Sequence, residues 1–353
     1  MASGTIMRRA LVLSFVSLVS VSTPALAQVS PAGEEATIRV NVRLVRILAT
    51  VKDQSGALVG ALEKNDFEVR DNGAPQQIAV FERQTDQPLS VAVLIDNSGS
   101  TAKDLKYETD SVMRFVRALL REGNPADAVG LYSFNWQVVK QNGFTRNPLA
   151  VERNLRQLRG EAGTSLYDAI LLASRDIEDR EGRKILIVVT DGGDTTSHAD
   201  FQRATEAAQL ADAVIYPILV VPITNDAGRN TGGENALTTM SQRTGGRVFQ
   251  PSAGAAMDQA FDQIIRDLRT QYVLGFYPKD VPLTRDRFHT LTLITRDPSL
   301  RINARSGYYG EALLQDPPQT SPGRITVTPG DETLRGRKPA PPKTVKTPGQ
   351  KGQ

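Results

Sequence analysis

Residues 89–100 read LSVAVLIDNSGS, and they give the clearest structural signal in the sequence. The first part, Leu89 to Ile95, is apolar apart from one serine, which is typical of a strand buried on both faces of a parallel sheet. The polar residues Asp96 to Ser100 follow at once. Open α/β sheets place their ligand sites in loops at the carboxyl ends of parallel strands. The stretch therefore predicts a buried parallel strand with a functional loop at its end.

Strands and helices alternate on both sides of the loop, from Pro88 to about Thr270. Apolar strands are expected at residues 128–134, 185–189 and 214–221, and helices with an apolar stripe at 105–119, 166–177 and 257–268. Pro217 interrupts the last strand, which indicates an edge or a bulge. This alternation predicts an α/β fold with a doubly wound, mostly parallel sheet.

A β pattern lies on either side of this α/β region. It begins with Ile38, Val40, Val42 and Leu44 at period two, and it returns after Thr270. The returning strands are too few to stand alone, so we expect them to pair with the N-terminal ones. The α/β region is then an insertion in a small β domain. The predicted segments are a signal peptide (1–27), an N-terminal β unit (36–85), the α/β domain (88–270), C-terminal strands (271–310) and a disordered tail (313–353).

The first residues and the composition bear on location and partners. Arg8 and Arg9 precede an apolar stretch and the small-x-small sequence Ala25-Leu26-Ala27, which predicts a cleaved signal peptide and a periplasmic or secreted protein. A membrane anchor is the rival reading, but the apolar core is short for it. Without the two arginines the chain keeps 40 basic and 39 acidic residues, so charge gives no case for nucleic acid. The absence of cysteine excludes disulfides and thiolate sites.

Three loops of the α/β region carry a consistent set of oxygen donors. Asp96, Ser98 and Ser100 follow the first strand, Thr164 precedes the helix near Leu166, and Asp191 follows a later buried strand. Two carboxylates and three hydroxyls suit a hard divalent cation, most simply Mg²⁺, with Mn²⁺ or Ca²⁺ also compatible. Taken alone, the first loop could equally be a helix cap. The three loops together predict a metal site.

This pattern resembles the metal-ion-dependent adhesion site (MIDAS) of von Willebrand factor type A (VWFA) domains, over roughly residues 89–270. The resemblance implies that the serines and the threonine ligate the ion directly, and that the two aspartates often act through water. It also implies that a partner protein's Asp or Glu completes the coordination, so that the module serves adhesion or assembly and is not an enzyme. The flanking segments, including Gly307-Tyr308-Tyr309, are similar to exported VWFA-related proteins of acidobacteria.

Other interpretations stay open beside this one. A Mg²⁺-dependent phosphohydrolase of the haloacid dehalogenase type needs a second acid two residues after the first aspartate, where this chain has Ser98. A structural subunit of a cell-envelope complex would use the same site on a neighbouring subunit. Ser165 is expected to cap the helix that follows, His198 to lie in solvent, and Trp136 to be either a partner contact or a loop anchor.

Overall fold

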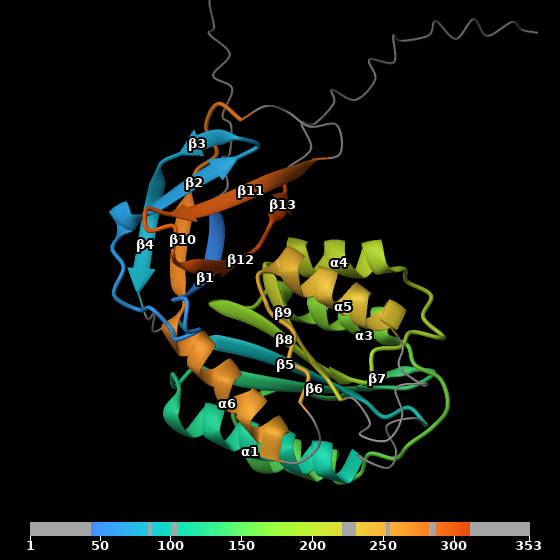
Figure 1. Ribbon diagram of the computed structural model, residues 1–353. Coiled ribbons are helices and arrows are strands. Elements are labelled where there is room, and N and C mark those ends of the chain that lie inside the picture. Colours follow the sequence, from blue (N-terminus) through green and yellow to red (C-terminus); the bar gives the residue numbers. More distant parts are fainter. Residues whose placement is uncertain are drawn as a thin grey trace, which may run out of the picture. The chain divides into compact units, whose positions relative to one another are not determined.

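A five-stranded sheet forms the centre of the α/β region in the computed structural model (Figure 1). The structure describes residues 44–83, 87–99, 105–220, 231–251, 255–281 and 287–310. The predicted signal peptide, the β residues Ile38, Val40 and Val42, the tail and Ser100 lie outside the described residues. The strands lie in the order β7-β6-β5-β8-β9. Their bounds are β5 (Leu89–Asp96), β6 (Ala128–Phe134), β7 (Val138–Thr145), β8 (Arg183–Thr190) and β9 (Ala213–Leu219).

Strand β5 is the middle strand, and it pairs in parallel with both β6 and β8. All eight of its residues are buried. Val91, Val93 and Ile95 enter one hydrophobic core, while Ala92 and Leu94 enter the core on the opposite face. A strand with a core on each face carries apolar residues on both faces, which is why the run from Val91 to Ile95 does not alternate.

Helices cover both faces of this sheet (Figure 1). The helices α1 (Leu105–Glu122), α2 (Pro148–Leu155) and α6 (Ala255–Thr270) contribute to the first core, where Phe115 stacks on Phe261 with ring centroids 4.8 Å apart. The helices α3 (Leu166–Glu178), α4 (Phe201–Leu210) and α5 (Thr231–Thr244) contribute to the second. The predicted α/β fold with a mostly parallel sheet is confirmed.

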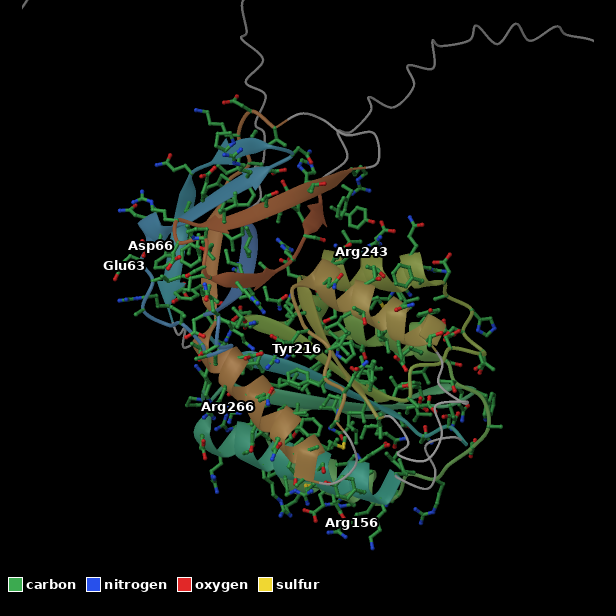
Figure 2. All side chains as sticks on the ribbon, viewed as in Figure 1. Glu63, Asp66, Arg156, Tyr216, Arg243 and Arg266 are labelled. Atoms are coloured by element: carbon green, nitrogen blue, oxygen red, sulfur yellow. The ribbon has the colours of Figure 1, made fainter. Side chains whose placement is uncertain are left out.

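Two details of the sheet are informative. Strand β9 lies at an edge, as Pro217 predicts, and its buried Tyr216 lies among the strands (Figure 2). Strand β7 pairs antiparallel with β6 at the other edge, and the sequence did not predict it.

None of the helices among the described residues combines the length and the apolar character that crossing a membrane requires.

The remaining strands form two antiparallel sheets of four strands each, ordered β12-β1-β10-β4 and β13-β11-β2-β3. The N-terminal strands are β1 (Val45–Lys52), β2 (Phe67–Asp71), β3 (Ala74–Gln76) and β4 (Ile78–Arg83), with a 3₁₀ turn at Lys64–Asp66. The C-terminal strands are β10 (Tyr272–Phe276), β11 (Phe288–Thr295), β12 (Arg301–Ala304) and β13 (Gly307–Tyr309).

Strands from the two ends of the chain pair with each other in both sheets, since β1 pairs with β10 in one and β2 pairs with β11 in the other. Their shared core includes Phe67 and Tyr272, whose rings meet edge-on at 5.1 Å. The expected pairing of N- and C-terminal strands around an inserted α/β region is therefore observed, and we call these two sheets the β unit. The exact segment boundaries stay predictions.

Candidate metal site

Asp96 is the last residue of β5, and the topology places it where a ligand site is expected. Strand β6 follows β5 in the chain and lies on one side of it in the sheet. The next parallel strand, β8, lies on the other side of β5. This reversal of strand order opens a crevice at the carboxyl ends of the strands in doubly wound sheets. Asp96 and Thr190 end two adjacent strands at that edge.

The carboxylate of Asp96 is held on both of its oxygens. The backbone N–H of Ser98 donates to Oδ1 at 2.8 Å, and the hydroxyl of Thr190 donates to Oδ2 at 2.6 Å. Asp96 is fully buried, and this burial raises its pKa from 3.8 to about 6, against the opposing effect of the hydrogen bonds from Thr190 and Ser98. The negative charge of Asp191 raises the pKa further. A nearby cation would offset both costs.

Asp191 and Thr164 lie in two loops that are joined to each other. Thr164 is 7% exposed, and its N–H donates to the hydroxyl of Thr195 at 2.9 Å. Its carbonyl accepts from the N–H groups of Thr195 (2.8 Å) and Thr196 (3.2 Å). Asp191 is partly buried and stands four residues before Thr195. The loop that carries Thr164 is therefore hydrogen-bonded to the loop that follows Asp191.

The first loop is connected to the Thr164 loop as well. Ser98 is 2% exposed and forms a parallel bridge with Glu161, and the N–H of Glu161 donates to the carbonyl of Asn97 at 3.0 Å. The structure thus brings Asp96 and Ser98 into direct contact, places Asp191 within electrostatic range of Asp96, and ties the loop of Thr164 to both neighbours. Ser100, the fifth predicted ligand, lies outside the described residues.

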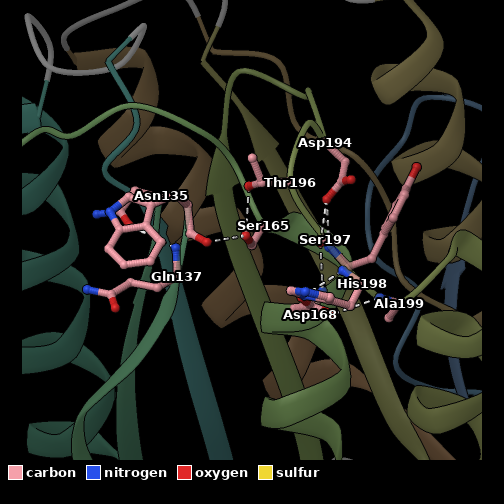
Figure 3. Close-up of polar contacts among 11 residues, drawn as sticks. Asn135, Gln137, Ser165, Asp168, Asp194, Thr196, Ser197, His198 and Ala199 are labelled. Carbon is pink, nitrogen blue, oxygen red and sulfur yellow. Dashed lines mark hydrogen bonds and ion pairs between the residues drawn. The ribbon is translucent and has the colours of Figure 1, made fainter. Parts of the chain in front are cut away.

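The start of α3 shows how its flanking loops are fixed (Figure 3). Ser165 occupies the N-cap position, but its side chain does not cap the helix, so that expectation is wrong. Its hydroxyl lies 3.0 Å from the carbonyl of Trp136 and 2.8 Å from the hydroxyl of Thr196. The capping bond comes instead from Asp194, whose Oδ1 accepts from the N–H of Tyr167 at 3.2 Å.

Asp168 in the first turn of α3 binds the loop that follows Asp194. Its carboxylate accepts from the N–H groups of His198 (2.9 Å) and Ala199 (2.8 Å). Burial works to raise the pKa of Asp168, but these hydrogen bonds outweigh it and hold the pKa below its ordinary value. The side chain of His198 is 97% exposed, which confirms that it is a solvated loop histidine.

Thr190 lies at the candidate site, and the sequence alone did not single it out. It is fully buried, donates to Asp96 and accepts from the N–H of Gly192 at 3.1 Å. Its place directly before Asp191 was visible in the sequence. Its contact with Asp96 was not, because that contact depends on the parallel register of β5 and β8, in which Ile95 faces Val189.

The donor set has the chemistry of a hard-cation site. Among the described residues there is no group of three or more His, Cys, Asp and Glu side chains suited to a metal. The predicted set does not need one, because it combines two carboxylates with hydroxyls and leaves other positions to water or a partner. Buried oxygen donors and a carboxylate that is costly to ionise alone fit Mg²⁺, Mn²⁺ or Ca²⁺.

Comparison with known proteins gives a domain match for this region. Residues 91–193 match the family model of the von Willebrand factor type A domain. A search of curated proteins finds no match. Among solved structures, the chain is similar to the vWF domain of the type V pili tip protein Mfa5 from Porphyromonas gingivalis, at 15% identity, a TM-score of 0.44, and coverage of 51% of this chain and 94% of that one. It is also similar to BatB from Bacteroides thetaiotaomicron, at 22% identity, a TM-score of 0.39, and coverage of 51% and 98%.

Proposed function

We propose that the protein binds a protein partner through a divalent cation, because residues 91–193 match the family model of the von Willebrand factor type A domain. The cation would be held by Asp96, Ser98, Ser100, Thr164 and Asp191, and an Asp or Glu of the partner would complete its coordination. The observation that carries the proposal is the buried carboxylate of Asp96 beside a second carboxylate at the switch point of the sheet.

The charge balance of the set favours binding over hydrolysis. Two carboxylates neutralise a divalent ion, and the hydroxyl ligands add no charge. The bound ion would supply an electrophilic centre for a partner's carboxylate. An enzyme of the phosphohydrolase class needs a general acid two residues after Asp96, and Ser98 at that position cannot act as one. The donor chemistry favours Mg²⁺, with Mn²⁺ and Ca²⁺ as alternatives.

The surface beside the Thr164 loop supports a docking role. Trp136 is 56% exposed, and its ring N–H donates to the carboxylate of Glu161 at 2.9 Å. Its backbone N–H donates to the carbonyl of Ala162 at 3.1 Å, which ties the main chain of Trp136 to a residue two positions before Thr164. Exposed tryptophans are enriched among residues that dominate binding energies. We therefore place Trp136 in the contact surface around the metal.

The lone tryptophan of the chain also provides a test. Glutarate, a simple dicarboxylate, is titrated into the protein in Mg²⁺ and in EDTA while the fluorescence of Trp136 is recorded. We expect a saturable response in Mg²⁺ that is absent in EDTA and lost in Thr164→Val. Thr239→Val is the matched control, because the Thr239 hydroxyl donates to the carbonyl of Asn235 within α5. Equal responses with and without Mg²⁺ would refute the proposal.

The proposal places the protein outside the cytoplasm, in the periplasm or secreted. It rests here on the predicted signal peptide, which ends at Ala27. N-terminal sequencing of protein recovered from the expressing cells should read from Gln28. A chain that keeps its first residues in the cytoplasmic fraction would contradict the location. The same site would serve an external ligand or a neighbouring subunit of an envelope complex. Light scattering separates the two, because a larger mass in Mg²⁺ than in EDTA indicates assembly with a neighbouring subunit.

A further inference from the structure

A basic cleft lies at the edge of the central sheet opposite to Asp96. It has a volume of about 70 Å³ and lies where β8 and β9 begin. Strand β8 runs from Arg183 to Thr190, so the cleft and the carboxylate site are about 23 Å apart along the strand. This distance makes it a separate feature from the candidate metal site.

The lining of the cleft is strongly cationic. Five of its residues carry a basic side chain: Arg46 of β1, Arg180, Arg183 and Lys184 around the start of β8, and Arg305 after β12. Asp212 is the one acidic residue among the described residues that line it, and it is already paired with Arg305 at 2.6 Å. The lining therefore holds an excess of positive charge, which a bound anion would reduce.

Arg305 presents an unused donor in this cleft. Its side chain is only 9% exposed. One guanidinium nitrogen, Nη1, pairs with Asp212, but within the described part of the chain Nε is buried and has no hydrogen-bond partner. A buried donor without an acceptor is costly, by roughly 1–3 kcal/mol. An oxygen of a bound anion would remove that cost.

Neighbouring basic groups are held in place by neutral acceptors. Arg183 is 5% exposed and donates to the backbone carbonyls of Leu268 and Gln87. Arg180 donates to the hydroxyl of Ser90 at 2.6 Å. These contacts fix the guanidinium groups without adding negative charge, so that the field of the cleft is pre-organised for an anion.

We infer that this cleft binds a small oxyanion of the phosphate class. The planar guanidinium group matches the geometry of phosphate oxygens. The volume limits the ligand, since pockets for drug-sized molecules measure roughly 300–1,000 Å³. Arg46 and Arg305 belong to the β unit, whereas Arg183 and Lys184 belong to the α/β region. The anion would therefore bridge the two parts and stabilise their junction, whether or not the metal site functions as proposed.

The test is calorimetric titration of inorganic phosphate into the full chain at low ionic strength, followed by thermal unfolding with and without phosphate. We expect one site per chain and a rise in the midpoint with phosphate concentration, because a ligand that binds only the folded state stabilises it. Arg46→Gln should weaken phosphate binding by at least about threefold, since it removes one exposed cation at the rim. Arg153→Gln, an exposed arginine of α2 outside the cleft, is the matched control.

Two more variants separate the site from its alternatives. Arg305→Lys keeps the charge but loses the guanidinium fork, and it should also weaken phosphate binding. Asp96→Ala should leave phosphate binding unchanged. Glycerol phosphate serves as a second probe: equal binding indicates recognition of a phosphoryl group on a larger molecule, and weaker binding indicates the free ion.

The inference is overturned by either of two results. The first is the absence of heat and of any thermal shift with millimolar phosphate in the wild type. The second is equal weakening by Arg46→Gln and Arg153→Gln, which would mean that phosphate responds to the overall charge and not to the cleft.

Discussion

Replacing Thr190 with valine removes the hydroxyl that holds Asp96 while keeping the shape of the side chain. Two hydrogen bonds are lost, one to Oδ2 of Asp96 (2.6 Å) and one from the N–H of Gly192 (3.1 Å). A hydrogen bond to a charged group contributes about 1.5–3 kcal/mol, and an orphaned buried donor costs about 1–3 kcal/mol. Because Thr190 is fully buried, water cannot replace either bond. We expect a loss of roughly 3 kcal/mol in the free energy of unfolding.

The assay is urea unfolding of EDTA-treated protein, together with Mg²⁺ titration of each variant. Thr190→Ser is the control, since it keeps the hydroxyl and removes one methyl group, at a cost of about 1 kcal/mol. The valine variant should also bind Mg²⁺ about tenfold more weakly, because groups that orient metal ligands have effects of this size. A valine variant that matches the serine variant in both stability and Mg²⁺ affinity would refute this account of Thr190.

Three other substitutions test the threonine loop, the junction with α6 and the buried carboxylate. Gly163→Ala should destabilise the protein by at least about 1 kcal/mol more than Gly56→Ala in urea unfolding. Both glycines have φ near +85°. A Cβ added at Gly163 meets a Trp136 carbon at 2.8 Å, whereas a Cβ added at Gly56 meets nothing within 4 Å. Equal losses of stability in the two variants would therefore contradict the predicted clash at Gly163. Asp267→Asn should lower the free energy of unfolding by about 3 kcal/mol, because this 3% exposed carboxylate pairs with two cations. The control is Asp258→Asn, since the Asp258 side chain is 36% exposed. A loss of stability in Asp267→Asn no greater than in this control would contradict the prediction. In metal-free protein, the raised pKa of Asp96 means that stability from its neutral form is present below about pH 4 and is lost as the pH rises past 6. Wild type should therefore lose up to about 3 kcal/mol more than Asp96→Asn between pH 4 and pH 8, and parallel pH profiles would rule this out.

The layered fold could be predicted because its central strands carry an unambiguous pattern. The run at Leu89–Ile95 is apolar for a reason that holds in any doubly wound sheet, namely that helices cover both faces. Other elements left weak signals. The buried stripe of α4 consists mainly of short residues such as Ala204 and Ala208, and β7 is half exposed and irregularly paired with β6. Neither gives the strong periodicity on which a sequence-based prediction depends.

The candidate site also has features that the sequence predicts and features that it does not. The position of Asp96 at a strand end follows from the sequence alone, because polar residues directly after a buried strand reach the carboxyl edge of the sheet. Contacts between loops do not follow from it. The bond from Thr190 depends on strand register, and the capping of α3 by Asp194 depends on how a distant loop folds back. Ser165 stands at the N-cap and yet uses its hydroxyl elsewhere, so residue preference at a cap does not specify its partner.

Direct titration of the cation tests the central claim most simply. Mg²⁺, Mn²⁺ and Ca²⁺ are added in a calorimeter to EDTA-stripped wild type, to Asp96→Ala and to the control Asp258→Asn. The account predicts one cation per chain in the wild type and the control, and none in Asp96→Ala. Absence of binding in the wild type, or unchanged binding in Asp96→Ala, would contradict it.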